Sequence, residues 1–82
     1  MIAAGTHALG LIVSAAAGTR GHRHALGLAH AARGAGVAVR AVVLTQPGNE
    51  IQETLRTAGA ECGPPEELAT IIAGAGRVMH FT

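Results

Sequence analysis

The apolar residues of this chain gather in short continuous runs, and the segments between the runs have helical periodicity. Residues 8–14 and 37–44 are apolar almost throughout, which is typical of strands buried on both faces of a parallel sheet. A very short strand is expected at residues 60–62, and a last one at residues 77–81. The pattern therefore supplies four strands for one sheet.

The segments between the strands predict three helices. In residues 22–33, apolar side chains recur at i, i+3, i+4 and i+7, which places them on one helical face: Ala25, Leu28, Ala29 and Ala32. Gly34 or Gly36 can end this helix in the left-handed conformation.

The second helix is expected to follow a turn at residues 46–49. Asn49 is the predicted N-cap, and Gln52 stands three residues later, as in a capping box. The buried face of this helix consists of Ile51, Leu55 and Ala58, and Gly59 ends it.

The third helix is expected to open at Pro64 and Pro65, because proline is favoured in a first helical turn. Glu66 and Glu67 lie in that turn, where the helix dipole favours negative charge. Its predicted buried residues are Leu68, Ile71 and Ile72.

Strands that alternate with helices predict an α/β fold. The order is β-α-β-α-(β)-α-β, a small three-layer parallel-sheet sandwich of flavodoxin- or Rossmann-like topology that spans residues 1–82 as a single domain. We expect strand 9–14 in the centre of the sheet, with strand 37–44 beside it. Reactive groups of such sheets gather at the carboxyl ends of the strands, here loops 15–21, 45–49 and 61–64.

Composition adds limits to this picture. Hydrophobic residues make up 49% of the chain, yet it has one Phe, no Trp and no Tyr, so the core must be thin and aliphatic. We expect such a small domain to self-associate or to pair with a homologous subunit. The formal net charge is +1 with scattered arginines, which does not favour nucleic-acid binding. One cysteine allows no internal disulfide.

The apolar run at residues 9–18 resembles the core of a secretion signal. However, no Lys or Arg precedes it, and His7 interrupts the lead-in to it. Ten residues are also too few to cross a bilayer. We therefore expect a cytoplasmic protein without membrane association.

The only thiol of the chain is the main candidate for chemistry. Cys62 lies in the segment 60–65, before the expected third helix, whose N-terminus would lower the thiol pKa and make the sulfur nucleophilic. The alternative is that Cys62 is a small buried hydrophobic residue. His80, in the last strand, could serve as the base for Cys62 if the fold brings the two together. Glu61, Glu66 and Glu67 are interpreted as helix-dipole partners rather than catalytic acids.

A second candidate is the segment from Gly18 to Gly21, which joins the first strand to the first helix. Its glycines could let backbone N–H groups approach an anion, and Arg20 and Arg23 could bind an oxyanion or a partner's carboxylate. It matches neither the dinucleotide-binding nor the P-loop pattern. A flexible turn is the alternative interpretation.

The histidines of the first helix do not predict a metal site. His22 and His24 point about 160° apart on a helix, and His30 lies about 12 Å further along its axis from His22. No pair has the i, i+4 spacing of helical zinc ligands. We expect these histidines to face solvent, and we expect neither a metal nor a cofactor.

Three segments together resemble the DsrE/DsrF/TusD-like sulfur-relay family. They are residues 11–14 with the following helix and strand to residue 44, residues 55–62, and residues 68–81. In that family the middle segment carries a sulfur-bearing cysteine, and the matching position is Cys62. This chain is shorter, because only Gly63-Pro64-Pro65 separates the cysteine from the last helix.

The resemblance implies a sulfur-relay protein, and thus a sulfurtransferase, that carries persulfide sulfur on Cys62. Its partners would be homologous subunits in a homo- or hetero-oligomer, together with donor and acceptor proteins. The alternatives are a non-catalytic oligomeric or regulatory subunit of the same fold, and a small anion- or nucleotide-binding module that uses residues 18–21.

Overall fold

The computed structural model describes residues 9–82, so His7 and Ala8 of the sequence predictions lie outside the described residues. The elements follow one another as β1 (Leu9–Val13), α1 (Arg20–Gly34), β2 (Val39–Val43), α2 (Asn49–Thr57), β3 (Glu61–Gly63), the 3₁₀ turn η1 (Pro65–Glu67), α3 (Leu68–Gly74) and β4 (Arg77–Phe81).

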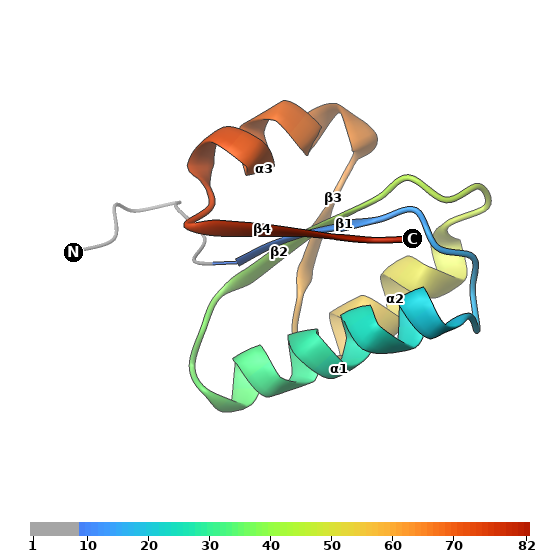
Figure 1. Ribbon diagram of the computed structural model, residues 1–82, viewed down its shortest axis with the longest axis horizontal. Coiled ribbons are helices and arrows are strands. Elements are labelled where there is room, and N and C mark those ends of the chain that lie inside the picture. Colours follow the sequence, from blue (N-terminus) through green and yellow to red (C-terminus); the bar gives the residue numbers. More distant parts are fainter. Residues whose placement is uncertain (1–8) are drawn as a thin grey trace.

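The four strands form one parallel sheet in the order β3-β2-β1-β4. The predicted central position of the first strand and its pairing with the second are confirmed. Helices α1 and α2 cover one face of the sheet and α3 covers the other, which gives the predicted three layers (Figure 1). The chain steps outward from β1 to β3 and then returns to the far side of β1 as β4. The order reverses between β1 and β4, which makes their carboxyl ends the switch point of the sheet.

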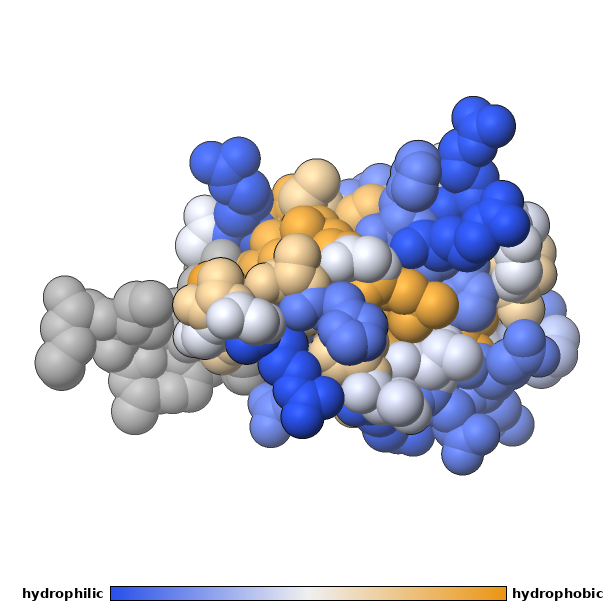
Figure 2. All heavy atoms as spheres, turned by 90° about the horizontal axis from the view of Figure 1, so that it is seen from below, coloured by the Kyte–Doolittle hydropathy of each residue, from blue (hydrophilic) through white to orange (hydrophobic). Residues whose placement is uncertain are grey.

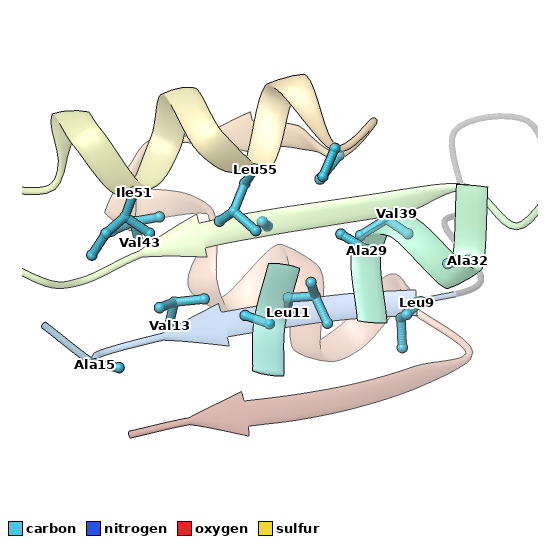
Figure 3. Packing of buried hydrophobic residues seen from close by; sticks show 14 residues of the cluster. Leu9, Leu11, Val13, Ala15, Ala29, Ala32, Val39, Val43, Ile51 and Leu55 are labelled. Atoms are coloured by element: carbon cyan, nitrogen blue, oxygen red, sulfur yellow. The ribbon is translucent and has the colours of Figure 1, made fainter. Parts of the chain in front are cut away.

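The hydrophobic core lies between the sheet and the α1/α2 layer. Alternate strand residues point into it, because successive side chains of a strand face opposite sides. Leu11, Ile51 and Leu55 are fully buried there (Figure 3). The buried hydrophobic residues of helix α1 are the small Ala25, Ala29 and Ala32, and Leu26 and Leu28 pack against this core partly buried. The predicted thin aliphatic core is thus present, and α1 packs on the sheet through alanine.

On the opposite face of the sheet, α3 packs closely against β1 at Gly10. A Cβ added at Gly10 would lie 2.6 Å from Cγ2 of Ile71 and 3.1 Å from Cβ of Ala75. Only glycine at this position leaves room for α3 to lie against β1.

Two helix ends follow the sequence pattern. Gly36 and Gly59 adopt φ angles of +77° and +106°, the left-handed conformation expected where these helices end. The predicted capping box is wrong: Gly48 is the N-cap of α2, and Asn49 already lies inside the helix. From there its side-chain oxygen cannot accept the hydrogen bond that a capping residue receives.

The third helix differs from its prediction. It begins as the 3₁₀ turn η1 and continues as the seven-residue α3. Ile71 is buried, but Ile72 is 57% exposed. The predicted burial of Ile72 is wrong, because a helix of two turns rests on the sheet with one narrow face and Ile72 projects about 100° away from Ile71. No helix of residues 9–82 is long and apolar enough to cross a membrane.

Candidate functional site

Cys62 lies in the middle of β3, where it aligns with Ala41 of β2. The very short strand predicted at residues 60–62 is thus confirmed, shifted by one residue, whereas the loop expected at residues 61–64 begins only after Gly63. The strand continues through Gly63, which pairs with Val42, before the chain turns at Pro64. Extended pairing with β2 therefore draws the cysteine into the sheet.

The thiol of Cys62 points to the α1/α2 side of the sheet. Its Sγ lies 3.7 Å from the backbone oxygen of Gln52 in α2, to which it donates a hydrogen bond, and its side chain packs against the core. The residues on either side of it point to the other face: Glu61 and Gly63 lie beside Arg40 and Glu67, on the α3 side. The turn η1 thus begins on the face opposite the sulfur, and its N-terminus is not directed at the thiol.

Burial raises the pKa of Cys62 above its ordinary value, while the positive charges of Arg56 and Arg40 act in the opposite direction. The predicted lowering of this pKa by a helix N-terminus is wrong. Two causes account for the difference: the helix start lies across the sheet, and the half-buried sulfur loses part of its hydration.

His80 cannot act as a base for Cys62. β4 and β3 form opposite edges of the sheet, with β1 and β2 between them, so the two residues are separated by about 14 Å of strand spacing. They also face opposite sides. Nε2 of His80 lies 2.8 Å from Oγ of Ser14, at the carboxyl ends of β4 and β1. His80 thus stands at the switch point with a serine, a pairing that the sequence analysis missed.

The start of α1 contains a buried histidine. His22 is 4% exposed, against the expectation that it faces solvent. Its Nδ1 accepts a hydrogen bond of 3.0 Å from the N–H of Gly18, and its Nε2 lies 2.9 Å from Oγ1 of Thr54 in α2. One signal could have revealed this: His22 precedes Ala25 by three positions and Ala29 by seven, which is the spacing of the buried face.

This histidine changes the interpretation of residues 18–21. The N–H of Gly18 is already bound to His22 and is unavailable to an anion. A Cβ at Gly21 would collide with the backbone oxygen of Thr82, so the helix start is covered there by the end of β4. Arg20 and Arg23 are exposed at the first turn of α1. The anion-binding geometry predicted for the loop backbone is therefore not formed at Gly18.

Glu67 has a role that the helix-dipole interpretation did not anticipate. Its two carboxylate oxygens accept hydrogen bonds from Nε and Nη2 of Arg40, at 2.9 and 2.6 Å. Glu61 lies 3.5 Å from Nη1 of the same guanidinium. The Arg40–Glu67 pair ties η1 to β2, and it raises the pKa of Arg40 chiefly through the Glu67 hydrogen bond.

The described part of the surface includes a groove on the helical face and a hollow at the end of the sheet. The groove, of about 580 Å³, lies between α1 and α2 and is lined by Leu26, His30, Glu53, Thr54, Arg56, Thr57 and Ala58. Seen from this side, apolar side chains lie near the centre of the face and hydrophilic ones around them (Figure 2). The hollow, of about 380 Å³, lies between the loops that follow β1 and β2. Within residues 9–82, no three His, Cys, Asp or Glu side chains come together as metal ligands.

No match to this chain was found among protein-family models, curated proteins or solved structures.

Proposed function

We propose that this protein is a sulfur-relay subunit that holds persulfide sulfur on Cys62. The supporting observation is the environment of the only thiol in the chain. Cys62 is half-buried on an edge strand, and the positive charges of Arg56 and Arg40 favour its thiolate form. Partial burial would shield a bound sulfur atom from water, and the two guanidinium groups would stabilise the anionic form of a persulfide.

The proposed acceptance of sulfur is a thiol–persulfide exchange. The Cys62 thiolate attacks the terminal sulfur of a donor persulfide, R–S–SH. A new S–S bond forms at Cys62, the S–S bond of the donor breaks, and the donor leaves as the thiolate R–S⁻. No electrons are gained or lost overall. Because burial keeps the resting thiol protonated, this exchange is expected to be slow at neutral pH and to quicken as the thiolate fraction rises.

The partners that follow from this proposal are a persulfide donor protein, an acceptor protein and further subunits of this kind, all in the cytoplasm. β3 is an edge strand, so a donor can approach the cysteine from the side of the sheet that no strand of residues 9–82 covers. The sulfur chemistry and the assembly are separate parts of the proposal and are tested separately.

The test of the sulfur chemistry is intact-protein mass spectrometry after incubation with inorganic polysulfide at pH 7 and pH 9. We expect the wild-type protein to gain one sulfur atom, faster at pH 9, and the Cys62→Ser variant to gain none. A wild-type protein that stays unmodified at both pH values while remaining folded would refute the relay function.

A second function is favoured by a specific observation. The Cys62 thiol donates its proton to the Gln52 carbonyl and packs against the core, as a structural cysteine does. In this case the protein is a non-catalytic assembly or regulatory subunit. In that case Cys62→Ala would lower the stability of the protein, and neither the wild-type protein nor the variant would take up sulfur.

A further inference from the structure

The two edges of the sheet differ in how they are protected. β3 is three residues long and runs directly into Pro64 and Pro65, and short strands and prolines are common means of blocking an edge. β4 is five residues long and contains no proline. Figure 1 is seen from the β4 side, and no other element passes in front of this strand. Within residues 9–82, no strand pairs with the outer edge of β4.

The backbone groups on the outer edge of β4 can be identified. The N–H of Ser14 donates to the carbonyl of Phe81 at 2.9 Å, so the polar backbone groups of Phe81 point toward β1. In a parallel strand this direction alternates from residue to residue. Met79 and Arg77 therefore also bond to β1, while the N–H and C=O groups of Val78 and His80 point outward.

We propose that two copies of this chain pair through the outer edges of β4, antiparallel and around a two-fold axis at Met79. Val78 of one copy then faces His80 of the other, and each such pair exchanges two hydrogen bonds, as opposed residues do in an antiparallel ladder. Met79 faces its own equivalent across the axis. The result is a continuous eight-stranded sheet. This inference deepens the proposed assembly and rests on that part alone, not on the sulfur chemistry.

The register around Met79 is the one that the side chains favour. It places the guanidinium of Arg77 opposite the aromatic ring of Phe81, a pairing that cation–π attraction supports. Centring the axis on His80 would remove the Arg77–Phe81 pairing, and a parallel pairing in register would oppose two arginines. Like charges directly opposite each other destabilise a sheet.

Helix α1 supports the same arrangement. It lies over β4, β1 and part of β2, and its side toward α2 carries Leu26 and His30. Its other side, above β4, carries mainly small or apolar residues at helical spacing: Gly21, His24, Leu28 and Ala31. In a pair joined through β4, these two faces of small and apolar residues would lie on the same side of the sheet, one on each side of the seam.

The experiment uses sedimentation equilibrium of the 82-residue chain in the Cys62→Ser background, which separates the result from any sulfur chemistry. We expect a dimer at micromolar concentration. Met79→Glu opposes two carboxylates at the axis and should yield a monomer. An equimolar mixture of the Met79→Glu and Met79→Lys variants should restore the dimer. The control is Ile72→Glu, an exposed apolar position on α3, which should leave the dimer intact.

A second measurement tests the register directly. Equivalent residues at a non-hydrogen-bonded antiparallel site have Cα atoms about 4.5 Å apart, which suits a disulfide. The variant Cys62→Ser/Met79→Cys should form a covalent dimer under mild oxidation, and Cys62→Ser/Ile72→Cys should not. A folded monomeric protein at 100 µM, or a dimer that Met79→Glu leaves intact and Met79→Cys does not cross-link, overturns the proposal.

Discussion

Nε2 of His22 and Oγ1 of Thr54 lie 2.9 Å apart and join α1 to α2 across 32 residues of sequence. Nδ1 of His22 accepts from the N–H of Gly18, so it carries no proton. Nε2 must therefore carry the ring proton and donate it to Thr54. The Thr54 hydroxyl in turn donates to the carbonyl of Ile51 at 2.8 Å. Each polar group in this series of hydrogen bonds has its partner, and together the bonds fix the loop after β1 against both helices.

Removing the His22 imidazole should destabilise the protein. His22→Ala removes a buried ring, leaves the Gly18 N–H without its acceptor and takes from the Thr54 oxygen the hydrogen bond that it accepts. We expect a loss of about 2 kcal/mol in the free energy of unfolding. Urea denaturation followed by circular dichroism measures it. His30→Ala, on the exposed side of the same helix, should change stability by less than about 0.5 kcal/mol. Equal effects of the two substitutions would contradict a special role of His22.

The hydrogen bonds also predict the tautomer of His22. At pH 8, where histidine is ordinarily neutral, long-range ¹H–¹⁵N spectra should show a proton on Nε2 and none on Nδ1. In Thr54→Val the Nε2–H loses its acceptor, and its resonance should exchange faster with water. A proton on Nδ1 in the wild-type protein would be incompatible with the Gly18 contact.

Two glycines should respond in opposite directions to alanine. Gly10→Ala drives a methyl group into Ile71 and should cost about 1–3 kcal/mol, because α3 must move away from β1. Gly27, in the middle of α1, has nothing within 4 Å of the added Cβ. Gly27→Ala should stabilise the protein by about 0.5–1 kcal/mol through helix propensity. Thermal or urea unfolding of both variants provides the test, and a neutral Gly10→Ala would mean that α3 does not rest on β1.

The raised pKa of Cys62 predicts a pH dependence of stability. The folded state holds the thiol proton more tightly than the unfolded state, so this contribution is complete below the unfolded pKa and is lost as pH rises through the folded pKa. The chain has no Lys and no Tyr, which leaves Cys62 as the side chain that titrates in this alkaline range. Unfolding free energies measured from pH 7 to pH 10.5 should therefore decline above pH 9 in the wild-type protein and much less in Cys62→Ser.

The rate of alkylation of Cys62 offers an independent measure of the same shift. The midpoint of its pH profile should lie above the ordinary thiol value of 9.0, because burial outweighs the two arginines. Arg56→Gln should move the midpoint further upward, since it removes one of the charges that favour the thiolate. A wild-type midpoint below the ordinary value would reverse the assignment of burial as the dominant cause.

The Arg40–Glu67 pair should contribute measurably to stability. Both side chains are partly buried, with 26% and 30% of their surface exposed, and the two hydrogen bonds form a bidentate contact. Glu67→Gln should cost about 1–2 kcal/mol. Glu66→Gln, at the exposed neighbouring position, should cost less than about 0.5 kcal/mol. The measurement is the free energy of unfolding in urea. Similar losses in Glu67→Gln and Glu66→Gln would show that the Arg40–Glu67 pair does not hold η1 against the sheet.

The architecture could be predicted from the sequence because it depends on local patterns. The mostly apolar runs at residues 8–14 and 37–44 are typical of strands in a sheet covered on both faces, and the helical segment between them favours parallel pairing. The glycines at positions 36 and 59 ended their helices as expected, since a left-handed residue at that point is a local requirement.

The surroundings of individual side chains depended on the tertiary structure. Whether Cys62 stands in a turn or in a strand was decided by its pairing with Ala41, and this pairing also turned the sulfur away from the helix that follows. His80 lies far from Cys62 because the return of the chain places β4 beyond β1, at the opposite edge of the sheet. His22 and Thr54 meet only when α1 and α2 pack on the same face. The distances between side chains, their burial and the pKa of the thiol are determined by contacts between segments remote in sequence. The helices and strands themselves follow from the spacing of apolar residues along the chain.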